Sequence, residues 1–477
     1  MRPAFLPHIV LIVMDSASAR RFSLYGHIRD TSPGMRRIAD AGVLYRHCFT
    51  PAIWTIPSHV SLFTGLYPKD HGCNLIHHVL PDYYYTLPEI LQEVGYRTVV
   101  ISSNMLISPA FQFNRGFSEY YGMDNLINSP RYYQALAAFK AFKKTTSSEL
   151  KRFLFVIKDS WKNLHFFPLQ DLINKVHKKY WRDVIKSSSY ATERTVRYFR
   201  EIFSNCPDNR PIFLFINFME THYDFNPPPG YNNIIKISRR QKKKIARLNW
   251  KDFYLRNGFS PEEVELSRLL YDQEVAYLDD RIFQLYSFLG DLGLLDNTLF
   301  IVTADHGEFL GEHGLWGHEF GVYNELIHVP LVIKFPASLE KKGVSANLVQ
   351  LNDLFATIAE ITDFPYPVPE SSFSLLGPPR DFALTDLSVL PYEPYKFKEM
   401  APQFEPWPEM QPCWAFIDSQ LHKLILWADG RQELYNLQED FGEQHNLRDQ
   451  ADFRMKAEEM EQRLAYLMGP DTQSRLG

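Results

Sequence analysis

Four continuous apolar runs of strand length recur along the chain, and each of them ends in polar residues. They cover residues 8–15, 98–104, 212–222 and 298–306. Helical patterns lie between these runs, for example over residues 87–95 and 271–289. Strands that are apolar on both faces and alternate with helices predict an α/β fold, in which helices cover both sides of a large, mostly parallel sheet.

The pattern changes after a proline-rich stretch at residues 364–370. Short strand-like runs separated by turns follow, and the chain then shows a last amphipathic helix. The apolar stripe of this helix consists of Phe453, Ala457, Met460, Leu464 and Leu467. We therefore expect a large domain over residues 1–370 and a smaller subdomain with an antiparallel sheet over residues 371–477.

Charge is distributed unevenly along the chain. The net charge is −5, yet residues 129–186 hold thirteen Lys or Arg against four Asp or Glu, a net of +9. Aromatic residues interleave with these cations in an insertion of about residues 125–190, and the segment 230–260 carries a second basic run, RRQKKK. The insertion is either a solvated helical excursion or a platform that docks on an anionic membrane or polymer. Nothing indicates specific nucleic-acid binding or an oligomeric state.

The apolar stretch at residues 9–14 is too short to span a membrane, and we interpret it as a buried strand. The four cysteines, Cys48, Cys73, Cys206 and Cys413, lie too far apart for a disulfide framework or a CxxC metal pair. These features predict a cytoplasmic protein, with peripheral membrane attachment as the alternative.

Polar residues follow each of the four predicted strands: Asp15, Asn104, His222, and the pair Asp305 and His306. In parallel sheets, ligands bind beyond the carboxyl ends of the strands. Carboxylates and imidazoles gathered at one edge predict a metal site. Taken singly, each of these residues could instead cap a helix or hold a loop.

Thr55 precedes Pro57 by two residues, and proline favours the first turn of a helix, here predicted to run through Phe63. A hydroxyl at a helix N-terminus is well placed to attack an anionic ester centre. It could equally be a simple N-cap. Metal coordination would activate a weak hydroxyl nucleophile. The ligand set expected for that metal favours Zn²⁺ or Mn²⁺, with Ca²⁺ and Mg²⁺ as alternatives, and consists of Asp15, Thr55, Asp305 and His306.

The segments TADHGEFLGEHGLWGH (303–318) and WTIPSH (54–59) resemble the two signature regions of the sulfatase family in the alkaline phosphatase superfamily. The resemblance implies an α/β/α sandwich around a large mixed sheet, followed by a smaller C-terminal α/β subdomain. It places Asp15, Thr55, Asp305 and His306 on the metal and nucleophile positions. It places His222 and His318 on positions that contact the substrate.

Four residues depart from the sulfatase pattern. Thr55 stands where sulfatases carry the Cys or Ser that becomes formylglycine, and its β-methyl prevents formation of the aldehyde. His59 replaces an arginine, Ser16 replaces an acidic residue, and His318 replaces a lysine. No formylglycine is therefore expected.

The arrangement is instead similar to that of phosphoester members of the superfamily. Nucleotide pyrophosphatases/phosphodiesterases and phosphoethanolamine or glycerophosphate transferases use a threonine nucleophile. In the transferases a histidine stands twelve positions after the one that matches His306, as His318 does here. We expect Thr55, His222 and His318 to be catalytic, and His59 and Asn104 to contact the substrate.

The function predicted from these residues is metal-dependent hydrolysis of a phosphoester, either a diester or a phosphonate or phosphate monoester. A head-group transferase is the first alternative, and the basic insertion would then hold a lipid or polymer acceptor. A sulfatase is the next alternative. A non-catalytic binding module is the alternative outside enzymes, and the loss of an acidic residue at Ser16 favours it.

Overall fold

The computed structural model describes residues 6–74, 77–122, 188–204, 210–228, 230–231, 237–245, 248, 250–390 and 395–469. The basic insertion predicted over about residues 125–190 lies almost entirely outside these residues. Its proposed contact with a membrane or polymer stays a prediction.

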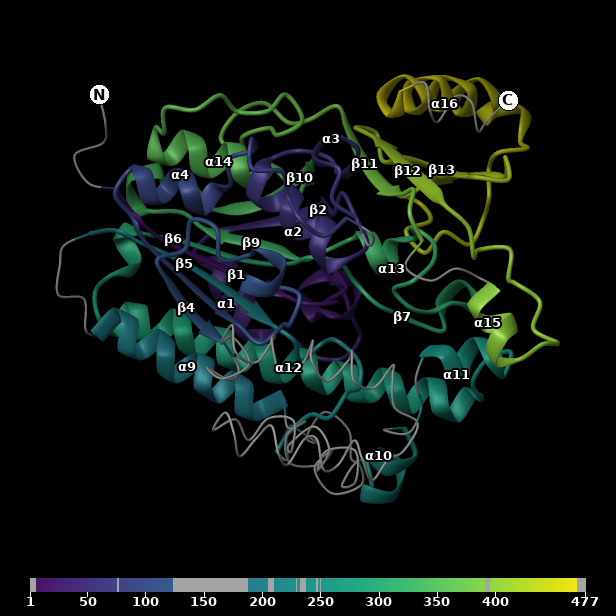
Figure 1. The fold of residues 1–477 in the computed structure, drawn as a ribbon, viewed down its shortest axis with the longest axis horizontal. Helices are drawn as coiled ribbons and strands as arrows, with labels where there is room; N and C mark the ends of the chain where they lie inside the picture. Colours follow the sequence, from purple (N-terminus) through teal and green to yellow (C-terminus); the bar gives the residue numbers. More distant parts are fainter. Residues whose placement is uncertain are drawn as a thin grey trace, which may run out of the picture.

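An eight-stranded sheet forms the centre of the molecule (Figure 1). Its strands, in spatial order, are β10 (Gly343–Gln350), β2 (Val43–Phe49), β9 (Leu331–Lys334), β6 (Thr298–Ala304), β1 (His8–Met14), β5 (Ile212–Phe218), β3 (Arg97–Ser102) and β4 (Glu119–Gly122). The four strands predicted from apolar runs, β6, β1, β5 and β3, are adjacent in the middle. Their side chains are almost all buried, which explains why these strands lack polar alternation.

All neighbouring strands are parallel except β9, which runs antiparallel to β2 and β6. The sheet is therefore mixed and mostly parallel, as predicted. In register, Met14 at the end of β1 pairs with Phe218 of β5 and with Ala304 of β6. The central strands consequently end at the same level, and the residues that follow them share one edge of the sheet.

Helices cover both faces of this sheet. On one side α12 (Pro261–Asp291) packs against α1 (Pro33–Asp40) and α9 (Ser188–Ser204). On the other side α2 (Thr55–Thr64) packs against α4 (Leu87–Glu93) and α14 (Asp353–Thr362) (Figure 1). The predicted α/β/α layering is confirmed.

A second, antiparallel sheet follows near the C-terminus. It consists of β11 (Phe382–Leu387), β12 (Cys413–Asp418), β13 (His422–Trp427) and β14 (Gln432–Asn436). The last helix, α16 (Arg454–Met468), packs on β12 and β13. The predicted stripe faces this sheet, with Ala457, Met460 and Leu464 buried and Phe453 and Leu467 partly buried.

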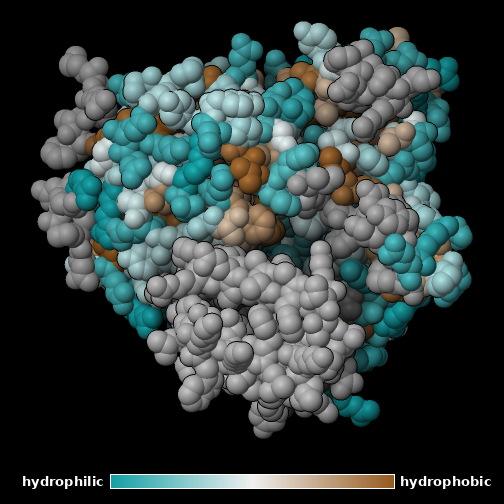
Figure 2. All heavy atoms as spheres, viewed as in Figure 1, coloured by the Kyte–Doolittle hydropathy of each residue, from teal (hydrophilic) through white to brown (hydrophobic). Residues whose placement is uncertain are grey.

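Short elements complete the described chain: α3 (Pro68–His71), α10 (Arg239–Ile245), α11 (Trp250–Leu255), α13 (Asn324–Ile327), α15 (Tyr395–Met400) and the hairpin β7 (Phe309–Leu310) with β8 (Trp316–Gly317). The basic run 239–244 forms most of α10. Part of its charge is paired within the molecule, since Lys244 Nζ lies 2.7 Å from Glu262 Oε2. On the face seen in Figure 2, apolar side chains of the described residues gather only in small groups. Within the described ranges, no helix has the length and apolar character of a membrane span.

Candidate active site

Two carboxylates and one imidazole meet at the carboxyl edge of the central sheet. Asp15 directly follows β1, and Asp305 and His306 directly follow β6. One ligand atom from each of the three lies within 4.8 Å of the others. Backbone N–H groups fix Asp305, because Ser16 and His306 donate to its Oδ1 over 3.1 and 2.8 Å. Its second oxygen, Oδ2, is left for another partner.

Two buried polar atoms of this cluster, Asp305 Oδ2 and His306 Nε2, have no hydrogen-bond partner among the residues that the structure describes. The Nδ1 of His306 donates to the carbonyl oxygen of Gly307 over 2.9 Å, so that Nε2 carries the lone pair. Buried polar atoms without partners are rare and require an explanation. A divalent cation provides one, since two carboxylates and an imidazole form a donor set suited to Zn²⁺ or Mn²⁺. The residues therefore fit a metal.

The electrostatics agree with this explanation. Burial raises the pKa of Asp305 well above its usual range, and the neighbouring charge of Asp15 raises it further. Burial lowers the pKa of His306 to about 3, with a further contribution from His318. Two carboxylates this close together in a buried site repel each other unless a proton or a cation lies between them. A divalent cation would allow both to ionise.

Thr55 is the first residue of α2, as the sequence predicted. Its hydroxyl donates to Asp15 Oδ2 over 3.5 Å, and the side chain is only 4% exposed. The N-terminus of α2, with its unpaired N–H groups and positive dipole end, therefore points to the same edge as the carboxylates. Such an arrangement favours an anion close to the Thr55 hydroxyl.

Asn104 follows β3 and lies 5% exposed beside the same carboxylate. Its Nδ2 donates to Asp15 Oδ2 over 2.6 Å, and its Oδ1 accepts from the backbone N–H of Leu106 over 2.8 Å. Both ends of the amide are thus engaged within the protein. The structure brings Asn104 to the site, and its observed contact is with the carboxylate of Asp15.

His59 lies one turn along α2 from Thr55 and is completely buried. Its Nδ1 donates to the Thr55 carbonyl oxygen over 2.7 Å and lies 3.7 Å from Asp305 Oδ2. Edge contacts with Phe63, Phe113 and Phe215 surround the ring. Burial lowers its pKa to about 4, which favours the neutral imidazole. His59 therefore lies behind the first turn of α2.

Of the two remaining predicted histidines, His318 lies next to His306 and His222 lies next to His318. The ring of His318 is 4.7 Å from that of His306 and 5.1 Å from that of His222, measured between centroids. His222 is partly exposed, and its Nδ1 donates to the Tyr223 carbonyl oxygen over 2.7 Å. All of the predicted site residues are thus brought to one edge of the sheet.

Sequence reasoning missed two buried acids beside His318. The two carboxyl oxygens of Glu308 lie 3.3 and 3.2 Å from His318 Nδ1. Glu319 accepts the backbone N–H of His318 over 2.9 Å. Burial raises the pKa of Glu308 to about 8 and lowers that of His318 to about 3. The signal available in the sequence was the position of Glu308, two residues after His306.

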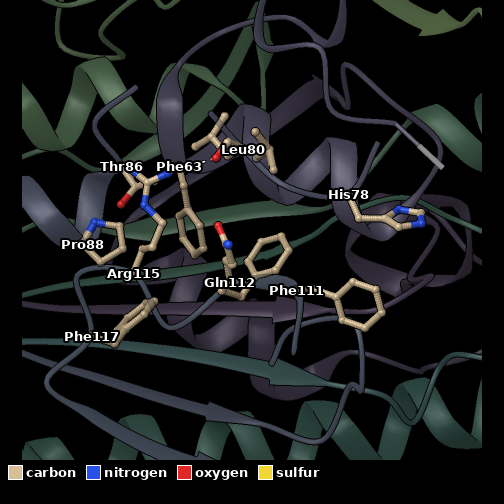
Figure 3. A pocket seen from close by; sticks show the side chains of 11 residues that line it. Phe63, His78, Leu80, Thr86, Pro88, Phe111, Gln112, Arg115 and Phe117 are labelled. Carbon is tan, nitrogen blue, oxygen red and sulfur yellow. Dashed lines mark hydrogen bonds between the residues drawn. The ribbon is translucent and has the colours of Figure 1, made fainter. Parts of the chain in front are cut away.

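A cavity of about 30 Å³ lies elsewhere, alongside α2 (Figure 3). Phenyl rings of Phe63, Phe111 and Phe117 line it, and His78 and Gln112 also border it. Neither Thr55 nor the carboxylates contribute to this cavity. It is an apolar gap between α2 and the loop after β3, and it is separate from the candidate site.

Comparisons with known proteins show which sequences and folds this chain is similar to. The curated N-acetylglucosamine-6-O-sulfatase of Bacteroides thetaiotaomicron is 23% identical to this chain. The matched region covers 73% of this chain and 66% of that protein. Human iduronate 2-sulfatase is 23% identical over 85% of this chain and 80% of its own length. The phosphonate monoester hydrolase of Agrobacterium radiobacter shares the fold with a TM-score of 0.66, at 18% identity, over 97% of this chain and 95% of that one.

Two family models match the sequence. The model described as N-sulphoglucosamine sulphohydrolase, C-terminal, matches residues 311–469, which include the small antiparallel sheet. The model described as Sulfatase matches residues 7–364, well over half of the 477 residues and all of the site residues described above. The chain belongs to the sulfatase family.

Proposed function

We propose that this chain is a metal-dependent ester hydrolase that uses Thr55 as its nucleophile and acts on a phosphodiester or a phosphonate monoester. The observation that carries the proposal is the position of the Thr55 hydroxyl. It lies at the N-terminus of α2, 3.5 Å from Asp15 Oδ2. Asp15 in turn clusters with Asp305 and His306, whose Oδ2 and Nε2 atoms are buried and have no hydrogen-bond partner among the described residues. A hydroxyl placed there can attack an anionic ester that the helix N-terminus holds.

The curated relatives hydrolyse, by their names, sulfate esters, and membership of their family supports ester hydrolysis by this chain. The presence of Thr55 is evidence against sulfate ester hydrolysis, because a threonine cannot become the formylglycine on which sulfatases depend. The phosphonate monoester hydrolase shares the fold, and a phosphorus ester suits a direct hydroxyl nucleophile. Phosphoryl transfer to Thr55 is the reaction that uses the residues present.

Four residues would hold the cation: Asp15, Asp305, His306 and, through its hydroxyl oxygen, Thr55. When bound, a divalent metal lowers the pKa of the hydroxyl and neutralises the negative charge of the ester oxygens. Asn104 holds Asp15 Oδ2 in place through a short, charge-assisted hydrogen bond. His59 holds the Thr55 carbonyl oxygen and thereby fixes the first turn of α2.

In the reaction, Thr55 Oγ1 forms a bond to phosphorus while the bond from phosphorus to the leaving oxygen breaks. The hydroxyl proton leaves towards Asp15 Oδ2, to which Oγ1 donates. His318 gives a proton to the leaving oxygen, and His222, partly exposed at the rim, orients the ester. Water then attacks phosphorus and gives one proton to His318, while the bond from phosphorus to Oγ1 breaks and Oγ1 takes its proton back from Asp15.

The charges around the site favour an ester with a single negative charge. In the described part of the chain, the side-chain hydrogen bonds and ion pairs of Asp305, His306 and His318 join them to carboxyls, imidazoles and backbone groups, and no lysine or arginine takes part in them. A phosphate monoester carries two negative charges close to pH 7, whereas a diester or a phosphonate monoester carries one. We expect kcat/KM for bis(4-nitrophenyl) phosphate to exceed that for 4-nitrophenyl phosphate by at least about tenfold, or 1.4 kcal/mol. A preference for the monoester would contradict the charge argument.

The test of the proposal is capture of the covalent intermediate. Metal-loaded protein is quenched in acid during turnover of a 4-nitrophenyl phosphonate, and its peptides are analysed by mass spectrometry. We expect the substrate's phosphonyl group on Thr55 and on no other residue, with none in Thr55→Ala. An adduct on another side chain, or turnover without Thr55, would overturn the assignment.

Sulfate ester hydrolysis is the second candidate, because both family models and both curated relatives carry sulfatase descriptions. Parallel assays on 4-nitrophenyl sulfate and the phosphorus esters at equal metal loading rank the two activities. Adding an alcohol acceptor to the same assays distinguishes hydrolysis from group transfer, since a transferase forms the new ester in place of free phosphate. The cytoplasmic location proposed from the sequence is independent of these outcomes.

A further inference from the structure

The carboxyl group of Glu308 faces the imidazole of His318 inside the protein. Each residue is about 3% exposed, and both oxygens of Glu308 lie within 3.3 Å of His318 Nδ1. Because Glu308 occupies Nδ1, the only ring nitrogen of His318 left to contact an ester is Nε2. The acid is therefore in a position to determine how the imidazole is used.

The surroundings of His318 leave the ring little freedom to turn. The indole of Trp54 packs against it at 5.2 Å, and the imidazoles of His306 and His222 lie at 4.7 and 5.1 Å, measured between centroids. Its backbone N–H is held by Glu319 Oε2 over 2.9 Å. A second acid thus fixes the main chain, while Glu308 fixes the side chain.

We propose that Glu308 is a positioning residue that holds His318 Nδ1 and so presents Nε2 to the leaving oxygen of the ester. The inference rests on the proposed function, in which His318 gives the leaving oxygen its proton. Glu308 does not touch the substrate in this scheme. It acts through the imidazole, as the buried acid of a Ser-His-Asp triad acts through its histidine.

The proton transfer balances within the pair. For His318 to act in this way, the pair must hold two protons before reaction, one between a Glu308 oxygen and His318 Nδ1 and one on Nε2. As the bond from phosphorus to oxygen breaks, its electron pair goes to the leaving oxygen, which takes the proton from Nε2. The shared proton then stays on Nδ1, and Glu308 is left as a carboxylate. The water that attacks the phosphothreonine in the next step returns a proton to Nε2.

The experiment compares two phosphonate esters of equal charge in metal-loaded protein. A 4-nitrophenoxide leaving group needs no proton, whereas an alkoxide does. We expect Glu308→Ala to lower kcat/KM for the alkyl ester by about 100-fold or more, and that for the aryl ester by less than about fivefold. His318→Ala should show the same pattern, and the double variant should lose no more than either single one. Glu308→Gln, which preserves shape but has no transferable proton, serves if the alanine variant does not fold.

The matched control is Glu319→Gln, because it removes a buried carboxyl whose hydrogen bond goes to the backbone N–H of the same histidine. Its ratio of aryl to alkyl ester hydrolysis should equal that of the wild type. Equal losses on both esters in Glu308→Ala, or additive losses in the double variant, would overturn the proposal.

A second readout does not depend on turnover. In ¹⁵N-histidine spectra, assigned with His318→Ala, the Nδ1 resonance of His318 should shift in Glu308→Ala and stay in place in Glu319→Gln. An unchanged resonance would refute the contact with Glu308. If the wild type hydrolyses neither ester while this shift is present, the proposed function fails and the positioning of His318 by Glu308 stands.

Discussion

Replacing Asn104 with alanine tests whether this residue serves the metal or the substrate. The sequence assigned Asn104 to the substrate, whereas the structure shows its Nδ2 donating to Asp15 Oδ2 over 2.6 Å. If that bond orients a metal ligand, the variant should bind the metal more weakly. With the metal saturating, its KM should equal that of the wild type.

The magnitude follows from the bond that is lost. A hydrogen bond to a charged group contributes about 1.5–3 kcal/mol, and each 1.4 kcal/mol is a factor of ten in affinity. We therefore expect metal affinity to fall by about 10- to 100-fold, the range found when partners of metal ligands are removed. The lost acceptor for the Leu106 N–H, over 2.8 Å, should lower the free energy of unfolding by a further ~1 kcal/mol.

The assay is a titration of metal-free protein with Zn²⁺ and Mn²⁺ against a competing chelator, together with activity measured as a function of free metal. Ser102→Ala is the matched control, because Ser102 Oγ accepts the Asn104 N–H over 3.1 Å in the same turn but does not touch Asp15. Metal affinity within twofold of the wild type, combined with a raised KM at saturating metal, would refute this account. Asn104 would then be a substrate contact, as the sequence suggested.

Two further predictions concern the nucleophile and pH. Thr55→Ala should lower kcat by at least about 10⁴-fold, yet cost only ~1 kcal/mol of stability because the hydroxyl contact is 3.5 Å long. Thr64→Ala, at the far end of α2, should keep full activity, and wild-type rates in Thr55→Ala would refute the assignment. Burial raises the pKa of Glu220 from 4.5 to about 7, so the folded state holds this proton more tightly than the unfolded chain. The contribution of Glu220 to the free energy of unfolding is therefore fully present below pH 4.5. It is lost as the pH rises through 7, and the total loss is about 3 kcal/mol. Glu220→Gln should flatten the unfolding free energy across that range, and an unchanged pH profile by chemical denaturation would contradict this.

The fold was predictable where burial leaves a clear pattern. Strands β6, β1, β5 and β3 are buried on both faces, and continuous apolar runs therefore identified them. The outer strand β10 was not predicted, because the side chains of its first five residues are exposed or only partly buried. Its backbone pairing with β2 holds it in the sheet. The four-residue β9 is too short to separate from a buried loop by composition. Backbone pairing leaves little trace in side-chain patterns.

Within the site, the positions of some residues could be predicted from the sequence, whereas the contacts of others could not. Asp15, Asp305 and His306 were predictable because parallel strands ending at one level place the following residues together. The contacts of Asn104 and His59 were not, because the side-chain rotamer decides whether an amide or imidazole points to substrate or to protein. Both were assigned to the substrate. Both have their observed hydrogen bonds with groups of the protein.

The loop after β6 carries both the proposed metal ligands and the glutamate that contacts His318. A Cβ on Gly307 would lie 1.9 Å from the backbone oxygen of Glu325, so only glycine lets the chain pass so close to α13. That close passage follows directly on the proposed metal ligands Asp305 and His306, and it allows Glu308 to reach the ring of His318 ten residues later. The same backbone path thus fixes the proposed metal ligands and the proposed proton donor. A larger residue at position 307 should therefore impair metal binding and discrimination between leaving groups together, while Glu308→Ala should impair only the second.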